Sequence, residues 1–583
     1  MRFLSVAVLL FVGNPLSAAL PADPLRFIPD KADLVIKIEN PRQLLETITT
    51  HPAVLKGQEL EGVRPLLDTA QVRRFFEFIA YYERDFGMKW PELLDKLAGG
   101  GIVLGSKIKD GNDDPVLFAV QATDEALLIK FIERATELFK QELARADAKD
   151  GLTKEKYQNW EVIHLGKDLH ACRIDSALLF SNKLEGLKAG IDQHVQNISK
   201  GGKPAKNMLG SARVAAARKL LPPNPNVWLW YGFDYLKQQP QAMDLLKTPR
   251  DNTILTFLFA GYLDIARRAD FLAIGLYLNK DEAKLAIRMP AGRDGMAEDV
   301  ELHLPRDPKV GGTLPLLEPD GTLLSHSFYL DLATFWEKRA KIMNASNAKD
   351  FEKGVKDAGR FLPGTSLEKL FMQSGVHHRL VAVQRPLTAG YKVEPQVRIP
   401  AFAFVTTMRD PAFAKSMEVL IRGGLAFAST QVSVQLLEET HSGVKFFGYR
   451  FPEDGKFPDD PQGLRFNFTP CYAVVNDQAV FASTREFCRE LIDLLQAEKK
   501  NGAAKSDANM QARLHATGLA DLLNAAPEQL LTQTILAQAV PEAEAKKQVE
   551  QLLTFLRTLG RGRIETNYSK NEFHFDIEWK FNK

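Results

Sequence analysis

The chain has 583 residues, of which 45% are hydrophobic and 25% charged, and its 75 basic residues nearly balance its 73 acidic ones. The net charge of +2 gives no indication of electrostatic capture of nucleic acid or of an anionic membrane, and we expect no nucleic-acid partner. This length predicts two to four domains, and the ordinary apolar fraction excludes long disordered regions.

The first 19 residues are typical of an export signal. Arg2 supplies a positive charge, an apolar run extends from Phe3 to Val12, and small residues follow at the cleavage position. The run is too short to span a bilayer of about 30 Å, and no later segment reaches about 18 uninterrupted apolar residues. The sequence therefore predicts a soluble, exported protein, periplasmic or extracellular, with no integral membrane segment after signal cleavage.

The chain contains three cysteines, Cys172, Cys471 and Cys488. A core of this size does not need disulfides for stability. Cys172 and Cys471 occupy similar positions on predicted strands, which favours a buried packing role for both. A disulfide between Cys471 and Cys488 is an alternative. The spacing of the cysteines matches no zinc site, and we expect no cofactor.

The first predicted element after the signal is a strand followed by a helix, in the segment ADLVIKIENPRQLLETI from Ala32. Asn40 stands at the helix-cap position, and Pro41 occupies the first helical position that proline favours. A similar segment, HSFYLDLATFWEKRAKI, begins at His326 and places Asp331 at the cap. The two segments therefore predict the same strand–cap–helix structure.

The same kind of match recurs farther along the chain. DPVLFAVQATDEALLIKFIERATELF, from Asp114, predicts an apolar strand, a capping Asp124 and a helix with one buried face. IPAFAFVTTMRDPAFAKSMEVLIRGGL, from Ile399, predicts the same elements with Asp410 as the cap. A third pair predicts strand, turn, strand and Ser-capped amphipathic helix, in LHACRIDSALLFSNKLEGLKAGID from Leu169 and PCYAVVNDQAVFASTREFCRELID from Pro470.

An aromatic strand is predicted from Asn226, and it places Trp228 and Trp230 on one face. Two interpretations are open: a stacking platform for sugars or peptides, or burial in the core, which is favoured. Asp234 follows at a cap position, as Asp521 does in a similar segment farther on. The two segments hint at a fourfold pattern, although strand–cap–helix joins are common in unrelated proteins.

Two hairpins with alternating polarity complete the matched pairs, from Asp270 and from Gly562. We therefore predict an internal duplication with the fold class α+β, in which each half is a mainly antiparallel sheet covered on one face by amphipathic helices. The predicted boundaries are a signal at 1–19, a first half at 20–292, a connector at 293–320 and a second half at 321–583.

Two loop regions are also predicted. The connector region, rich in Gly, Pro and charge, contains one candidate strand, VELHL at residues 300–304. An acidic loop, FPEDGKFPDDPQ, covers residues 451–462. Its expected counterpart in the first half is a helical-to-loop segment at residues 147–157.

The search for catalytic chemistry finds only weak candidates. The sequence lacks the HExxH, GxSxG and GxxxxGK[ST] signatures. His378, within the trio His377-His378-Arg379, and His441 are candidate catalytic bases. Surface or edge-strand positions are the favoured interpretation of the trio.

The acidic loop offers candidate ligands for calcium, since carboxylate oxygens suit that ion. Its carboxylates lack the order of an EF-hand, and their proline neighbours favour a solvated turn. The four candidate metal ligands are Glu453, Asp454, Asp459 and Asp460.

The chain resembles a family of large exported bacterial proteins without an established function, grouped as a domain of unknown function. The resemblance rests on PxxADLVIxIxNPxxLL after the signal, on YAVVNDQAVFAS with its following helix, and on GTLLSHSFYLDLATFWEKR. These segments are predicted connections between strands and helices and contain no catalytic signature. The resemblance therefore implies export and a duplicated α+β build, and it carries over no active-site residues.

The sequence thus predicts an exported, non-enzymatic protein with a binding or cell-envelope role and an unknown protein or envelope component as its partner. Three alternatives remain open: a hydrolase with a dispersed His/carboxylate site, a carrier of apolar ligands held between sheet and helices, and a self-assembling envelope component.

Overall fold

The computed structural model describes residues 22–108, 114–145, 151–199, 206–247, 253–305, 312–362, 364–384, 390–428, 434–454, 460–502 and 505–582. The predicted export signal lies outside these residues. The chain divides into two compact units, Met1–Leu45 with Ile79–Ala215, and Glu46–Phe78 with Ala216–Lys583. The predicted connector at 293–320 therefore lies within the second unit. Across the described part of the chain, no helix is both long enough and apolar enough to cross a membrane.

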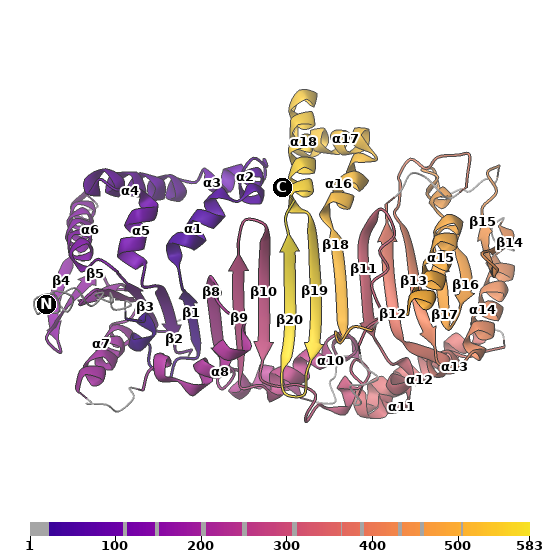
Figure 1. Cartoon of the computed structure of the whole chain (residues 1–583), viewed down its shortest axis with the longest axis horizontal. Helices are drawn as coiled ribbons and strands as arrows, with labels where there is room; N and C mark the ends of the chain where they lie inside the picture. The colour runs from indigo at the N-terminus through magenta and orange to yellow at the C-terminus, as the bar shows by residue number, and fades with distance from the viewer. Residues whose placement is uncertain are drawn as a thin grey trace, which may run out of the picture. The chain divides into compact units, whose positions relative to one another are not determined.

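The first unit contains an antiparallel sheet whose described strands follow the order β1-β2-β3-β7-β6-β5-β4. Strands β1 to β5 are labelled in Figure 1. The strands are β1 (Leu34–Ile38), β2 (Ile102–Ser106), β3 (Val116–Gln121), β4 (Leu152–Tyr157), β5 (Trp160–Leu165), β6 (His170–Ile174) and β7 (Ala177–Ser181).

Helices cover both faces of this sheet. Helix α7 packs on one face of β3, β6 and β7, while α5 and α6 pack on the opposite face around a core of leucine and aromatic side chains. The helices of this region, some of which continue into the second unit, are η1 (Pro24–Phe27), α1 (Pro41–Thr50), α4 (Ala70–Phe86), α5 (Trp90–Ala98), α6 (Glu125–Arg145), α7 (Leu184–Ser199), η2 (Met208–Gly210) and α8 (Ala212–Leu220).

The second unit contains a longer antiparallel sheet, with the strand order β8-β9-β10-β20-β19-β18-β11-β12-β13-β17-β16-β15-β14 in its described residues. The strands are β8 (Val227–Gly232), β9 (Phe271–Leu278), β10 (Glu282–Met289), β11 (Thr322–Tyr329), β12 (Ser374–Val383), β13 (Ala401–Met408), β14 (Gln435–His441), β15 (Val444–Arg450), β16 (Cys471–Val475), β17 (Gln478–Ala482), β18 (Met510–His515), β19 (Arg561–Tyr568) and β20 (Phe573–Lys580).

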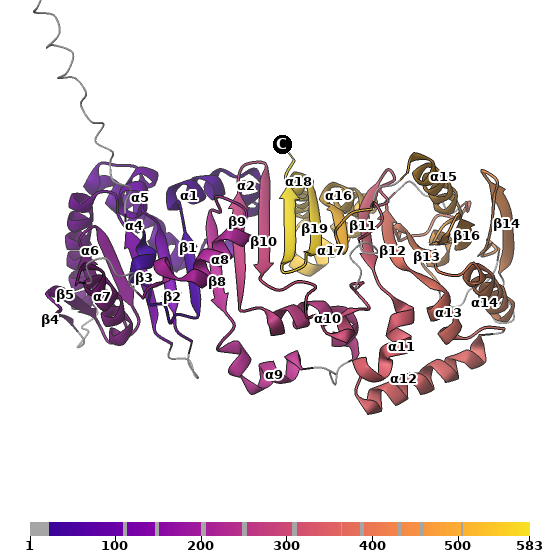
Figure 2. The same ribbon diagram turned by 60° about the horizontal axis from the view of Figure 1, so that its bottom comes forward.

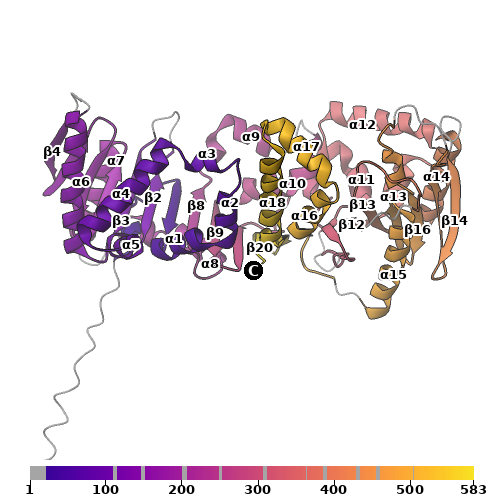
Figure 3. The same cartoon turned by 90° about the horizontal axis from the view of Figure 1, so that it is seen from above.

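Helices again pack on both faces. Helix α15 covers one face of β13, β17 and β16, whereas α13 and α14 lie on the other face (Figure 2). Helices α16, α17 and α18 pack together (Figure 3). The helices of this unit are α2 (Pro52–Gln58), α3 (Arg64–Leu67), η3 (Leu236–Gln238), α9 (Pro240–Leu246), α10 (Thr253–Arg268), η4 (Glu298–Val300), α11 (Leu332–Ile342), α12 (Ala345–Ala358), η5 (Gly359–Phe361), α13 (Leu367–Gln373), α14 (Ala412–Ala428), η6 (Leu464–Asn467), α15 (Arg485–Asn501), α16 (Ala516–Asn524), α17 (Pro527–Gln538) and α18 (Glu542–Leu559).

The α+β class is confirmed, and so are four of the predicted helix caps. In each case a carboxylate or amide oxygen accepts a hydrogen bond from a backbone N–H in the first turn, a group that the helix itself leaves unpaired. The donor–acceptor distances are 3.0 Å for Gln43 to Asn40, 2.9 Å for Leu127 to Asp124, 3.0 Å for Thr334 to Asp331 and 2.8 Å for Ala412 to Asp410. The predicted hairpins β9–β10 and β19–β20 also form.

Two predicted caps are wrong. Asp521 lies inside α16, which begins at Ala516 directly after β18. Asp234 precedes only the short 3-10 helix η3, which begins without a side-chain cap. Both errors have the same cause. The apolar residues that follow each strand allow the helix to begin at more than one position.

The serine cap predicted after β17 is also replaced. The hydroxyl of Thr484 caps α15 by accepting from the Phe487 N–H at 3.3 Å. Ser483 bonds instead to the neighbouring strand β13, whose Phe402 N–H it accepts at 2.8 Å. Of the two adjacent hydroxyl residues, Thr484 therefore caps the helix, and Ser483 bonds to the end of the neighbouring strand β13.

Three other expectations fail. Residues 300–304 form no strand, because Val300, Leu302 and Leu304 become buried through the short helix η4 and the turn after it. Residues 152–157 form strand β4, not a helical-to-loop segment. The sheets are covered by helices on two faces, because strands such as β13 carry apolar side chains on both sides.

Candidate binding groove

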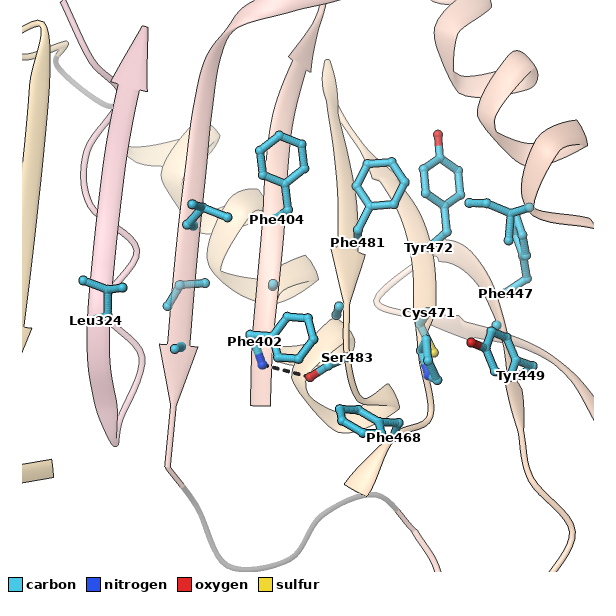
Figure 4. Close-up of a pocket in the computed structure, with 18 residues that line it drawn as sticks. Leu324, Phe402, Phe404, Phe447, Tyr449, Phe468, Cys471, Tyr472, Phe481 and Ser483 are labelled. Carbon is cyan, nitrogen blue, oxygen red and sulfur yellow. Dashed lines mark hydrogen bonds between the residues drawn. The ribbon is translucent and has the colours of Figure 1, made fainter. Parts of the chain in front are cut away.

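A groove lies on the face of the second unit's sheet that is opposite α15, across strands β12, β13, β17, β16 and β15 (Figure 4). We call it the aromatic groove. It encloses a cavity of about 580 Å³. Its lining residues are almost all apolar: Leu324, Leu380, Val381, Ala382, Phe402, Ala403, Phe404, Ile421, Phe447, Gly448, Tyr449, Phe468, Pro470, Cys471, Tyr472, Phe481, Ala482 and Ser483.

Strand register places the groove's rings side by side. Alternate residues of a strand face opposite sides, so Phe402 and Phe404 face the groove while Ala403 and Val405 face α15. Neighbouring strands align one groove residue from each strand in a row. The row runs from Leu380 through Phe404, Phe481 and Tyr472 to Phe447.

The rings in this row form an unbroken ladder. The centroid distances are 6.2 Å from Phe404 to Phe481, 5.0 Å from Phe481 to Tyr472 and 5.4 Å from Tyr472 to Phe447. These separations are those of favourable aromatic pairs. His378 extends the ladder, with its ring stacked 5.7 Å from Phe404.

Three further apolar side chains of the groove are exposed to water. Phe402 is 52% exposed, Leu380 40% and Leu324 38%. Large apolar side chains exposed together are unusual on a water-facing surface and mark sites of interaction. The groove therefore has the properties of a binding surface.

The few polar groups of the groove are mostly engaged within the fold. Ser483 bonds to β13, as described above, and the Tyr472 hydroxyl donates to the Ala414 carbonyl at 3.3 Å. Within the described residues the Tyr449 hydroxyl makes no hydrogen bond, and burial raises the pKa of this phenol. The groove thus offers an apolar ligand one neutral hydroxyl and no charge.

The histidine–arginine trio was predicted to lie at the surface or on an edge strand, and this prediction is wrong. It lies on β12, which is paired on both sides, and His377, His378 and Arg379 are all buried. His378 Nε2 donates to the Leu330 carbonyl at 2.9 Å, and its Nδ1 accepts from the Thr406 hydroxyl at 2.9 Å. Both ring nitrogens are therefore used within the fold, and burial lowers the pKa of His378.

His441 lies at the end of the edge strand β14. Its Nε2 is 2.8 Å from Asp493 Oδ2, while the Ser442 hydroxyl donates to Asp493 Oδ1 at 2.7 Å. Both groups lower the pKa of Asp493. In a catalytic triad the serine bonds to the histidine. Here both bond to one carboxylate and tie the β14–β15 turn to α15.

Trp228 and Trp230 are almost fully buried on β8, at 1% and 2% exposure. The Arg218 guanidinium lies 4.9 Å from the Trp228 ring centroid. A stacking platform needs ring faces open to a ligand, and this burial removes them.

The acidic loop directs two of its four carboxylates to arginines. Glu453 pairs with Arg450 at 3.1 Å, and Asp460 pairs with Arg465 at 2.8 Å. Asp454 is exposed, and Asp459 lies outside the described residues. Among the residues that the structure describes, no group of three or more His, Cys, Asp or Glu side chains could hold a metal ion.

The three cysteines are buried free thiols. This matches the packing role predicted for Cys172 and Cys471, and the alternative disulfide between Cys471 and Cys488 is not formed. Burial raises the pKa of Cys172 to about 12. A thiol so rarely ionised is a poor nucleophile.

Neither a protein-family model nor a curated protein matches the sequence, in agreement with the resemblance to a family without an established function. Among solved structures, crystal forms I and III of TP0453 are similar to 51% of this chain and to 89% and 90% of that chain. The identity is 9% and the TM-score 0.24 in both comparisons. A likeness of this strength carries no argument about function.

Proposed function

We propose that the protein is an exported, non-enzymatic binding protein that holds an apolar small molecule, such as a hydrocarbon chain, in the aromatic groove. The observation that carries this proposal is the row of aromatic and aliphatic side chains left accessible on one face of the sheet. Each additional buried methylene of a ligand stabilises binding by about 0.8 kcal/mol.

The backbone beneath the groove favours a small molecule over a peptide. Its five strands are each paired on both sides, so their N–H and C=O groups are already bonded. A peptide on this face would lose hydration of its own backbone without gaining partners. The cavity of about 580 Å³ lies within the range of roughly 300–1,000 Å³ typical of small-molecule sites.

The proposal is tested with the neutral fluorophore N-phenyl-1-naphthylamine, whose emission rises in apolar surroundings. We expect Leu380→Glu and Phe402→Glu to weaken its binding by about tenfold to a hundredfold each, because either carboxylate would need to be desolvated by the ligand. The two side chains are partly exposed, so the fold should tolerate both changes.

The matched control is Leu536→Glu, at a residue of α17 that is 77% exposed. This variant should bind the fluorophore as the parent does. Equal binding by all three variants, with unchanged circular dichroism, would show that the groove is not the site.

Export remains part of the proposal, supported by the composition of residues 1–19. Cell fractionation and N-terminal sequencing of the mature protein test it. Recovery of full-length protein in the cytoplasm alone would refute it. The protein or envelope partner remains a prediction.

We also infer that the chain arose by internal duplication. The strand pairings support this, because the series β1-β2-β3-β7-β6-β5-β4 and β11-β12-β13-β17-β16-β15-β14 have the same order. The aligned pair Phe118 and Phe180 also matches the aligned pair Phe404 and Phe481. In an experimental structure, residues 102–199 should superpose on 374–501 strand for strand. A superposition that aligned only the helices would argue against duplication.

A further inference from the structure

A second cavity lies beside the aromatic groove, between α14 and strands β14, β15 and β16. It encloses about 800 Å³ and shares Phe447 and Tyr472 with the groove. Charged side chains line much of it, so we call it the charged cavity. They are Lys415, Glu418, Arg422, Glu438, Glu439 and Lys445.

Each carboxylate of the charged cavity is paired with an arginine. Arg422 binds Glu418 at 2.8 Å and Glu438 at 2.5 Å. Glu439 pairs with two arginines of α15, Arg485 and Arg489. All three cavity glutamates are therefore already engaged by guanidinium groups of the protein.

In the part of the chain that the structure describes, the two lysines of the charged cavity, unlike its glutamates, have no partner for their side-chain charge. Lys415 on α14 and Lys445 on β15 are exposed. Within the described residues, the side-chain ammonium of neither lysine has a hydrogen bond or an ion pair. The charged side chains of this cavity that lack a described partner are therefore both cationic, and they suit an anion.

The order of residues along β15 links the two cavities. Lys445, Phe447 and Tyr449 alternate on one face of the strand, so successive side chains are about 7 Å apart. Tyr449 lines the aromatic groove, Lys445 lines the charged cavity, and Phe447 lines both. The Arg422 guanidinium lies 4.4 Å from the Phe447 ring centroid, where the apolar surface gives way to charge.

We propose that the ligand is an amphiphile with an anionic head, whose hydrocarbon tail lies in the aromatic groove while its head binds Lys415 and Lys445. This inference rests on the proposed function and adds to it the class of ligand. It follows from the side-by-side position of an uncharged aromatic surface and a cavity whose unmatched charges are cationic.

The test compares two ligands of equal chain length, dodecanoate and the uncharged dodecanol, as competitors of N-phenyl-1-naphthylamine. For the double variant Lys415→Gln/Lys445→Gln we expect dodecanoate to bind about fivefold to tenfold more weakly, because each exposed charge pair contributes modestly. Dodecanol should bind as it does to the parent. The preference of the parent for dodecanoate should also diminish as salt is raised.

Two control variants locate the head. Lys353→Gln removes an exposed lysine from α12 and should change neither affinity. Tyr449→Phe removes the hydroxyl at the opposite end of the row on β15. A selective loss of dodecanoate in this variant would place the head there and overturn the proposal.

The outcomes separate this inference from the function on which it rests. Equal affinities of the parent and the double variant for dodecanoate would overturn head recognition, while dodecanol binding would still support an apolar site. Failure of both ligands to displace the fluorophore from the parent would refute the proposed function itself.

Discussion

Replacing Arg379 by methionine is expected to destabilise the second unit by about 3–5 kcal/mol, the usual cost of breaking a buried ion pair. Arg379 is 1% exposed and its guanidinium binds both carboxylate oxygens of Glu498 at 2.9 Å. It also donates to Gln478 of β17 and to the Pro315 carbonyl. The substitution would leave the largely buried Glu498 carboxylate without its cation. Differential scanning calorimetry should show the loss as a lower transition temperature.

The double variant Arg379→Met/Glu498→Met provides the control. It removes both charges together, and buried pairs replaced by apolar residues often regain stability. We expect it to be more stable than Arg379→Met alone. If the single variant melted at the parent's temperature, the ion pair would not join α15 to the sheet as the structure indicates.

The second large effect concerns acid stability. Burial, together with nearby Lys505, His378 and Arg379, lowers the pKa of His377 to about 4. The unfolded chain therefore binds a proton at this residue between about pH 6.5 and pH 4 while the folded chain does not. Stability from the neutral ring is complete above about pH 6.5 and is lost as the pH falls.

From pH 7.5 to pH 5, His377 alone should account for about 2 kcal/mol of lost stability. Urea unfolding of the parent and of His377→Leu at both pH values measures this share. The variant should lose less stability on acidification than the parent does. His378 and His326, whose pKa values burial also lowers, should preserve part of the pH dependence in both proteins. Identical pH dependence of the two proteins would contradict a buried, neutral His377.

Short sequence patterns predicted four helix caps and two hairpins of this fold correctly. A short polar side chain just before an apolar periodic segment can accept a hydrogen bond from an unpaired N–H of the first helical turn. Four residues cap helices in this way: Asn40, Asp124, Asp331 and Asp410. The hairpins formed as predicted because their turns and alternating strands are adjacent in sequence.

The trio on β12 was predicted to lie at the surface because polar residues usually do. Its burial depends on partners far along the chain: Glu498 for Arg379, and Leu330 and Thr406 for His378. Only the pairing of β12 between β11 and β13 brings these partners together. Secondary-structure propensity and residue spacing carry no information about hydrogen-bond and ion-pair partners that are distant in the sequence.

The aromatic groove was missed for a similar reason. Its ring ladder combines Phe404, Phe447, Tyr472 and Phe481 from four strands, and their alignment depends on register. One signal was available. The segment AFAFV of β13 is apolar at successive positions, which predicts two apolar faces. The sequence does not reveal that part of the second face remains accessible.

Photolabelling tests the binding account most directly. Dodecanoate carrying an aliphatic diazirine at its terminal carbon would be bound, irradiated and mapped by peptide mass spectrometry. The account predicts labels on the groove-lining segments, residues 402–404, 447–449, 470–472 and 481–483, and their loss when unlabelled dodecanoate is added in excess. Labels confined to other surfaces, or labels that excess dodecanoate does not reduce, would contradict it.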